Sequence, residues 1–229
     1  MDIKLQVSAA HFGIQLHNLG KGKHWDNYFT KNECYIAELK QLKQKYDYVL
    51  GVDARDVLFF DTLQAIIDTY NTYYSGKLVF NAEDFTGKAA SYDLGTRTTR
   101  VKYENHRLNL PYTSANKYKY LNSGCFMGPI DLVITAMQAA YAYKDKWGNS
   151  VDNGPMEEVY LSSNYIVLDE QCRIFQIMSE NESGGVNFDL VYKQGKPYNR
   201  HTDTYPKILH AAGHSHFIQA WRILTGNYY

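Results

Sequence analysis

The sequence has few cysteines and no excess of charge of either sign. Its three cysteines, Cys34, Cys125 and Cys172, are scattered and form no CxxC pair. They therefore predict neither a disulfide framework nor a zinc site, and they suit a reducing compartment. The 24 lysines and arginines equal the 24 aspartates and glutamates in number. The chain as a whole thus has no field that would attract nucleic acid or a membrane surface.

Long apolar runs are also missing. No stretch approaches the ~20 apolar residues of a membrane span, and the opening MDIKLQVSAAHFG lacks the apolar core of a signal peptide. We therefore expect a cytoplasmic protein without membrane contact. The chain has 229 residues, 45% of them hydrophobic and 21% charged, with no repeat or low-complexity linker. This composition is typical of a soluble globular protein and predicts one domain over residues 1–229.

Strands and helices alternate in the first 80 residues, which predicts an α/β fold with a mostly parallel sheet and flanking helices. The expected strands are 14–19, 47–52, 77–82 and 207–209, and 120–128 as strand, tight turn and strand. The expected helices are 31–45, 61–74 with Asp61 as N-cap, 129–146 opened by Pro129, 154–164, and one after Gly213. We expect 47–52, 77–81 and 207–209 to share the central sheet.

Two carboxylates interrupt the apolar stretch YVLGVDARDVLFFD (48–61). Asp53 and Asp56 follow the strand 47–52, and burying unpaired carboxylates is costly. Ligands bind outside the carboxyl ends of strands in such sheets, so the turn can face a ligand. Two carboxylates on a tight turn can converge on one hard cation such as Mg²⁺ or Mn²⁺. The alternative is that Asp56 caps a turn and Asp53 pairs with Arg55 or a lysine.

A second polar cluster lies in PKILHAAGHSHF (206–217). His210 ends the strand, the small residues 211–213 allow close approach of the backbone to a ligand, and His214 and His216 follow. Histidines can bind a metal or contact phosphate oxygens. The alternative is a group of surface histidines near the start of a helix.

Four further polar residues are candidates. Asn122, next to Ser123 in YLNSGCFMG, can hydrogen-bond a polyhydroxylated ligand or form an Asx-type turn. Glu157 and Glu158, near the start of a predicted helix, can serve as a general base or accept from a sugar hydroxyl. They can equally complement the helix dipole. Asp84, after LVFNAE, is a candidate of the same kind.

In this order, the motifs resemble the glycosyltransferase domain of procollagen lysyl hydroxylases and their relatives, which has the GT-A fold. The landmarks cover most of the chain: GKGKHW (20–25), Lys31, YVLGVDARDVLFF, LVFNAED, YLNSGCFMG, NGPMEEVYLSSNYIVLDEQCRIFQ and PKILHAAG. The resemblance implies a metal-dependent glycosyltransferase with a UDP-sugar as donor and Mn²⁺ or Mg²⁺ as cofactor.

The resemblance also implies roles for individual residues. The metal ligands would be Asp53, Asp56 and His210. The donor-binding residues would be Trp25, Lys31, Arg55, Asp84, Gly213 and His216, with Arg55 where the family often has an aromatic residue that stacks on uracil. The residues that serve transfer would be Asn122, Glu157 and Glu158.

This sequence departs from the family pattern in several places. Only Asp2 and Ile3 precede the first helix-like stretch, so the family's first strand is expected to be absent, and an oligomer could complete the sheet. His210 is followed by Ala-Ala-Gly instead of Gly-Asn-Gly, and His216 aligns with a lysine expected near the diphosphate. The acidic run is also thinner.

The acceptor stays open between protein hydroxylysine and a hydroxymethylated pyrimidine in DNA. Residues 97–120 hold six Lys/Arg against one Glu, interleaved with tyrosines. Such a segment suits phosphates and unstacked bases, and the alternative is a solvated loop. The absence of a hydroxylase domain and of a signal peptide speaks against collagen, whose pathway is secretory. A different class of function is a non-catalytic binding module derived from a GT-A domain.

Overall fold

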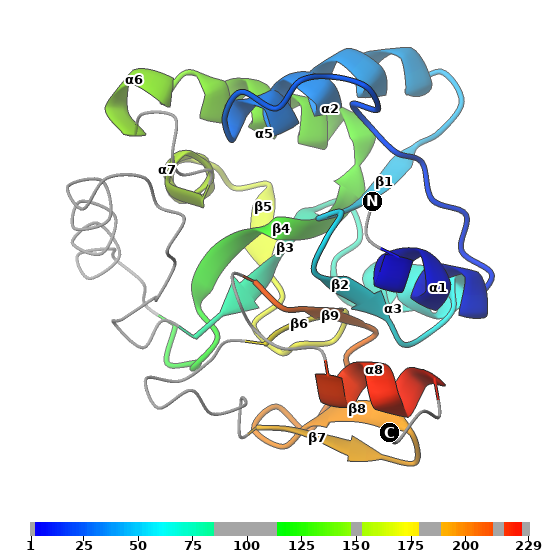
Figure 1. The fold of residues 1–229 in the computed structure, drawn as a ribbon. Helices are drawn as coiled ribbons and strands as arrows, with labels where there is room; N and C mark the ends of the chain where they lie inside the picture. The colour runs from blue at the N-terminus through cyan, green and yellow to red at the C-terminus, as the bar shows by residue number, and fades with distance from the viewer. Residues whose placement is uncertain (1–2, 85–113, 148–152, 179–188, 213–217, 226–229) are drawn as a thin grey trace.

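The computed structural model describes residues 3–84, 114–147, 153–178, 189–212 and 218–225 (Figure 1). The helices are α1 (Ile3–His11), α2 (Phe29–Leu42), α3 (Leu63–Tyr73), α5 (Ile130–Tyr141), α6 (Lys144–Trp147), α7 (Asn153–Ser162) and α8 (Ile218–Thr225). The strands are β1 (Tyr48–Val52), β2 (Val57–Phe59), β3 (Leu78–Glu83), β4 (Tyr120–Pro129), β5 (Ile166–Leu168), β6 (Phe175–Ile177), β7 (Leu190–Lys193), β8 (Lys196–Asn199) and β9 (Ile208–His210).

The larger sheet has the strand order β1-β4-β3-β5. The strand β4 runs antiparallel to both β1 and β3, whereas β3 and β5 are parallel. The expectation of a mostly parallel sheet was therefore wrong, and the fold is mixed α/β. The strands β1 and β3 do share one direction, as the alternation of strands and helices in the first 80 residues predicted, and β5 has this direction too. The strand β4 enters between β1 and β3 in the opposite direction, and the pattern of the first 80 residues contains no sign of it.

A second sheet has the order β2-β9-β6, with β2 antiparallel and β6 parallel to β9. The expectation that 207–209 shares a sheet with 47–52 and 77–81 was therefore wrong as well. The chain passes from the first sheet to the second between β1 and β2, through residues 53–56. The turn that carries both aspartates thus lies where the two sheets meet. The strands β7 and β8 form a separate hairpin.

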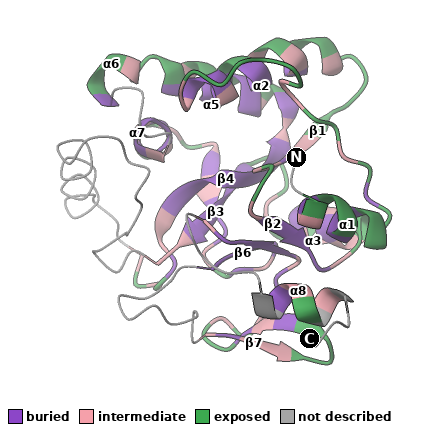
Figure 2. Cartoon of the chain, viewed as in Figure 1, coloured by how far each residue is buried: buried purple, intermediate pink, exposed green. Residues whose placement is uncertain are grey.

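Helices cover both faces of the larger sheet (Figure 1), and its strands are largely buried (Figure 2). The strands supply alternate residues to each side. Phe80 and Phe126 pack with apolar residues of α2, α5 and α7 in one core. Val79 and Met127, their neighbours in the strands, belong to a second core with residues of α1, α3 and the second sheet. This alternation is the period of two expected for a strand buried on both faces.

Three local expectations were also wrong. Residues 14–19 form no strand, and Ile14 and Leu16 instead pack their side chains in the second core. The N-cap of α3 is Thr62, whose hydroxyl accepts from the backbone N–H of Ala65. Asp61 instead accepts from the backbone N–H of Thr62. Residues 120–128 belong to one continuous strand. The segment 129–146 forms a helix as expected, but it is divided into α5 and α6.

None of the helices in the described ranges is both long enough and apolar enough to cross a bilayer.

Candidate metal centre

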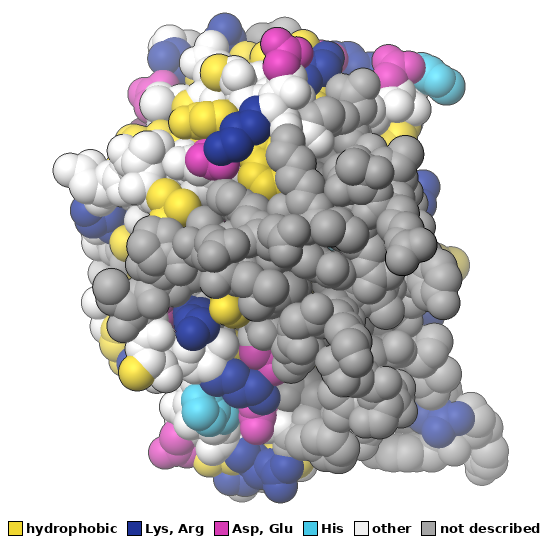
Figure 3. All heavy atoms as spheres, turned by 90° about the vertical axis from the view of Figure 1, so that its left-hand side faces the viewer, with side chains coloured by type: hydrophobic (Ala, Val, Ile, Leu, Met, Phe, Trp, Pro, Cys, Tyr) yellow, Lys and Arg dark blue, Asp and Glu magenta, His cyan; other side chains and the backbone are white. Residues whose placement is uncertain are grey.

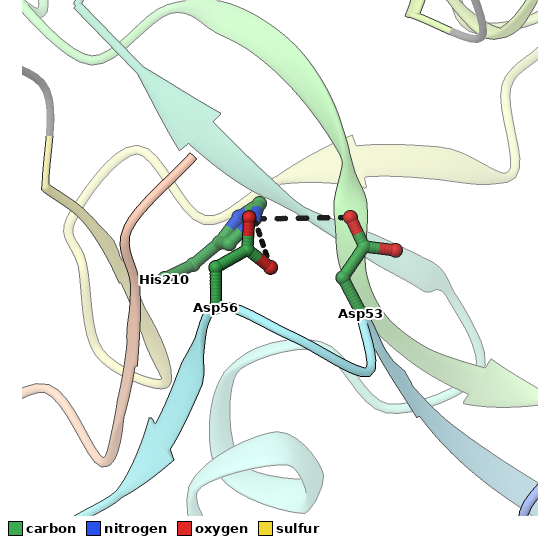
Figure 4. A group of neighbouring side chains, drawn as sticks. All are labelled: Asp53, Asp56 and His210. Carbon is green, nitrogen blue, oxygen red and sulfur yellow. Dashed lines mark ion pairs between the residues drawn. The ribbon is translucent and has the colours of Figure 1, made fainter. Parts of the chain in front are cut away.

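Three side chains converge at the junction of the two sheets (Figure 4). Asp53 directly follows β1, Asp56 directly precedes β2, and His210 is the last residue of β9. One ligand atom from each lies within 4.8 Å of the others. The Nε2 atom of His210 is 3.8 Å from Oδ2 of Asp53 and 3.6 Å from Oδ1 of Asp56. The structure therefore brings these three residues together, as the sequence predicted.

Backbone hydrogen bonds to neighbouring strands hold all three residues in place. The N–H of Asp53 donates to the carbonyl of Gly124 at 2.8 Å. The carbonyl of Asp56 accepts from Ala211 at 2.8 Å, and that of His210 accepts from Met178 at 2.7 Å. The cluster is thus built on the ends of strands, which fix side chains more precisely than a free loop does.

A bulge in β4 forms one wall of the cluster. Phe80 pairs with Phe126, but the next residue, Asn81, pairs with Asn122. Residues 123–125 of β4 therefore have no partner in β3 and form the bulge. A Cβ atom on Gly124 would lie 2.2 Å from Cε1 of His210 and 2.8 Å from Oδ2 of Asp53. The bulge therefore brings the backbone so close to the cluster that only glycine fits. This irregularity is what the sequence pattern suggested as a tight turn.

Lys31 of α2 joins the cluster from its outer side. Its Nζ lies 2.9 Å from Oδ1 of Asp53 and 3.1 Å from the carbonyl of Ser123 in the bulge. Only 12% of its side chain is exposed. Asp53 thus pairs with a lysine through one oxygen, as the alternative given above expected, and faces His210 through the other.

The residues present fit a divalent cation. Oδ1 of Asp56 is buried and accepts no hydrogen bond from the described part of the chain, since even Nε2 of His210 is 3.6 Å away. A buried carboxylate oxygen normally has a partner, and a cation would supply one. Two carboxylates suit a hard divalent cation such as Mg²⁺ or Mn²⁺, and an imidazole nitrogen is a further common metal ligand.

The protonation of His210 depends on the same neighbours. Burial on its own would lower the pKa of His210. The close approach and the negative charge of Asp56, followed by the charge of Asp53, outweigh burial and raise this pKa above its usual value. Without a cation, the two carboxylates therefore favour a proton on His210.

Asn122, expected to contact a sugar, uses its amide within the fold. Its Oδ1 accepts from the N–H of Gly124 at 2.9 Å, and its Nδ2 donates to Glu83 at 3.1 Å. The first contact spans two residues and is the Asx-type turn given above as the alternative. Ser123 donates through its N–H and its hydroxyl to Oδ1 of Asn153, both at 2.8 Å. These side chains hold the bulge against the start of α7.

The other expected site residues are more widely spread. Glu157 is fully buried in α7, and Glu158 pairs with Lys146 of α6. Arg55 is exposed on the turn between the two aspartates, and Trp25 is 55% exposed. Three more complete the set: Asp84 pairs with Lys117 at 3.1 Å, and Gly213 and His216 lie outside the described residues.

The basic segment 97–120 is described only from residue 114 onward. In that part, Lys117 pairs with both Asp84 and Asp189, and Tyr118 is buried and donates to Asp189 at 3.0 Å. These two residues are bound into the fold and are not part of a solvated loop. On the face shown in Figure 3, basic side chains (dark blue) lie next to acidic ones (magenta).

Motif analysis of the sequence missed three residues with a structural role. Asn81, in the apolar strand LVFNAE, contacts His210. Gly124 has no Cβ atom and so leaves room for the side chains of His210 and Asp53. Asp169 accepts from the backbone N–H groups of residues 173–175 and from the hydroxyl of Tyr74. A polar residue inside an apolar strand pattern was the available signal for Asn81 and Asp169.

Comparison with known proteins places the chain in a family. The family model described as PLOD GT domain matches residues 3–228. Uncharacterized protein R699 of Acanthamoeba polyphaga mimivirus is 26% identical over 213 residues, which cover 87% of this chain and 41% of that protein. The chain thus spans less than half the length of this relative. Since the family match covers nearly all of its residues, the chain belongs to the PLOD GT domain family, the glycosyltransferase domain of procollagen lysyl hydroxylases.

Proposed function

We propose that this chain is a metal-dependent glycosyltransferase of the GT-A type that moves a sugar from a UDP-sugar to a hydroxyl group. Membership of the PLOD GT domain family supports sugar transfer in general. The observation that carries the proposal further is the convergence of Asp53, Asp56 and His210 at the junction of two sheets. The fold alone would not require these ligand atoms to face one another.

In this proposal Asp53, Asp56 and His210 hold Mn²⁺ or Mg²⁺. Such an ion would supply positive charge that stabilises UDP as a leaving group. Lys31 holds Oδ1 of Asp53 at 2.9 Å and so keeps Oδ2 turned toward His210. Arg55, exposed between the two aspartates, is proposed to contact the nucleotide. Donor contacts of Trp25, Asp84, Gly213 and His216 stay predictions.

Transfer breaks the bond between the sugar C1 and the diphosphate oxygen and forms one between C1 and the acceptor oxygen. The acceptor hydroxyl must lose its proton in the process. Glu157 and Glu158 are the residues proposed to orient this hydroxyl or to take the proton. Glu158 is held by Lys146 and would have to act from within that pair. Asn122 contributes by supporting the bulge beside the metal ligands.

Hydrolysis or transfer of UDP-sugars in the presence of Mn²⁺ tests this proposal. Asp53→Asn should abolish the activity while circular dichroism shows an intact fold, and EDTA should abolish it in the wild type. Asp68→Asn is a matched control, since Asp68 is an exposed helix residue that pairs with Gln64. Equal activity in EDTA, or wild-type activity of Asp53→Asn, would contradict the proposal. Failure to bind UDP at all, measured by thermal shift with UDP and Mn²⁺, would favour the non-catalytic binding module.

The acceptor is proposed to be protein hydroxylysine or a hydroxymethylated pyrimidine in DNA, and salt dependence separates them. Transfer to DNA should weaken steeply with salt, because each neutralised phosphate releases counterions. Transfer to a hydroxylysine peptide should depend on salt only weakly. Charge reversal should weaken binding of DNA without an effect on UDP, and the residues to change are Arg97, Arg100, Lys102 and Arg107. Absence of transfer to DNA at every salt concentration would exclude it as acceptor.

A further inference from the structure

The two ring nitrogens of His210 face different partners. Nε2 faces the carboxylates of Asp53 and Asp56, at 3.8 and 3.6 Å. Nδ1 lies on the other side of the ring, 3.4 Å from Nδ2 of Asn81. His210 is 2% exposed and Asn81 is completely buried, so water does not compete for either contact. What Asn81 does at Nδ1 therefore decides what Nε2 can offer at the metal site.

Asn81 occupies a position in β3 where an apolar residue would otherwise be expected. The strand β3 is buried along almost its whole length, and both neighbours of Asn81, Phe80 and Ala82, belong to the core with α2, α5 and α7. The register of β3 on β4 shifts at the step from Phe80 to Asn81. Bulges of this kind commonly re-aim a side chain, and here the re-aimed side chain reaches His210. A buried amide is unfavourable unless it is hydrogen-bonded, so this contact needs an explanation.

The amide of Asn81 is incompletely satisfied in the orientation seen. Its Oδ1 is buried and accepts no hydrogen bond from any described residue. The oxygen and nitrogen ends of an amide have nearly the same shape, so a half-turn of the side chain exchanges them without repacking. The half-turn places Oδ1 beside Nδ1 of His210. The unsatisfied oxygen then gains a donor if Nδ1 carries the proton.

We propose that Asn81 is a positioning residue: its Oδ1 accepts from Nδ1–H of His210 and so directs the lone pair of Nε2 to a divalent cation held with Asp53 and Asp56. A neutral imidazole carries one proton, and a proton fixed on Nδ1 leaves Nε2 as the free ligand atom. Partners of this kind fix both the tautomer and the ring orientation of metal-binding histidines. The inference rests on the metal site of the proposed function and names the residue that makes His210 a competent ligand.

Binding of Mn²⁺ alone, measured by calorimetric titration of the full chain, tests this role without any need for turnover. Asn81→Leu keeps the size of the side chain but removes the acceptor, and it should weaken Mn²⁺ binding about 10- to 100-fold. Asn81→Asp keeps an acceptor oxygen and should bind Mn²⁺ within a few-fold of the wild type. Asn199→Ala is the matched control, because Asn199 is also fully buried but contacts Tyr118 and Gln176. It should lose stability and keep its Mn²⁺ affinity.

The tautomer is observed directly by ¹⁵N NMR of the histidine side chains in the wild type loaded with diamagnetic Mg²⁺ or Zn²⁺. We expect a proton on Nδ1 and a metal-shifted Nε2 for His210. A proton on Nε2 in the loaded protein would overturn the proposal, and so would wild-type Mn²⁺ affinity in folded Asn81→Leu. A wild type that binds no metal would overturn it together with the metal site. Metal binding with the expected pattern but without turnover of UDP-sugars would uphold this inference and reject only the proposed activity.

Discussion

Substitution of Gly124 by alanine should damage the metal site selectively. A Cβ atom at this position would lie 2.2 Å from Cε1 of His210, whereas ordinary carbon contacts are about 3.5–4.0 Å. The imidazole would therefore have to move by roughly 1 Å or more. Metal sites tolerate deviations of only about 0.2 Å in ligand distance. His210 should consequently be lost as a ligand, and Oδ2 of Asp53, 2.8 Å from the same Cβ position, should be displaced as well.

The expected magnitudes follow from linkage between binding and folding. At a Mn²⁺ concentration 100 times the wild-type Kd, binding should stabilise the native protein by about 2.7 kcal/mol. If Gly124→Ala weakens binding by about 10- to 100-fold, the same concentration should stabilise the variant by only roughly 0.4–1.4 kcal/mol. Urea unfolding with EDTA and with Mn²⁺ gives both values. The overpacking itself should cost about 1–3 kcal/mol in EDTA.

Gly51→Ala provides the matched control. A Cβ atom on Gly51 would lie 2.3 Å from Cζ of Phe126, so the overpacking is similar, but it presses on the aromatic core and not on His210. This variant should be destabilised in EDTA to a similar extent and keep the full stabilisation by Mn²⁺. The reasoning is refuted if Gly124→Ala keeps the wild-type response to Mn²⁺, or if Gly51→Ala loses it equally.

Two further predictions concern structural polar groups away from the metal ligands. Asp169→Ala should lower the free energy of unfolding by about 3 kcal/mol or more, because three backbone N–H groups and the hydroxyl of Tyr74 lose their buried acceptor. Urea unfolding should show this loss, and titration with Mn²⁺ should show an unchanged affinity in the folded variant. Thr62→Ala should cost about 1 kcal/mol, because Thr62 caps α3, whereas Thr62→Ser should cost much less. Equal losses in these two variants would contradict the cap assignment.

The sequence was informative where local pattern determines structure. The apolar spacing of Tyr35, Leu39 and Leu42 predicted α2, and Pro129 correctly marked the start of α5. The direction of β4 and the separate sheet around β9 could not be predicted in this way. Pairing between strands depends on segments far apart in the chain, and the apolar pattern of a buried strand is the same for either direction.

The residues of the candidate site were likewise predicted only in part. Resemblance to a family brought Asp53, Asp56 and His210 together, although each motif on its own was weak. Asn81 and Gly124 were missed, because their importance comes from a register shift between β3 and β4 and from the distance to a residue more than 80 positions away. Neither feature leaves a periodic trace in the sequence. Groups that support a ligand are therefore harder to predict than the ligands themselves.

Stability should depend on pH in opposite ways without and with metal. Burial works against a charged His210, but the close approach and charge of Asp56, followed by the charge of Asp53, raise the pKa of His210 in the folded, metal-free protein. A raised pKa contributes stability that is fully present below the unfolded value of about 6.5 and is lost as pH rises through the folded value. The metal-free protein should therefore lose this contribution as pH rises above about 6.5.

Metal binding reverses the sign, because the cation needs neutral His210 and competes with the proton. In Mn²⁺, stability should therefore rise over the same pH range in which it falls in EDTA. Urea unfolding from about pH 6 to about pH 8.5 should give two curves that diverge with increasing pH. His210→Gln removes the titrating group and should make the curves nearly parallel. Parallel curves in the wild type, or undiminished divergence in His210→Gln, would show that His210 does not link protons to metal binding.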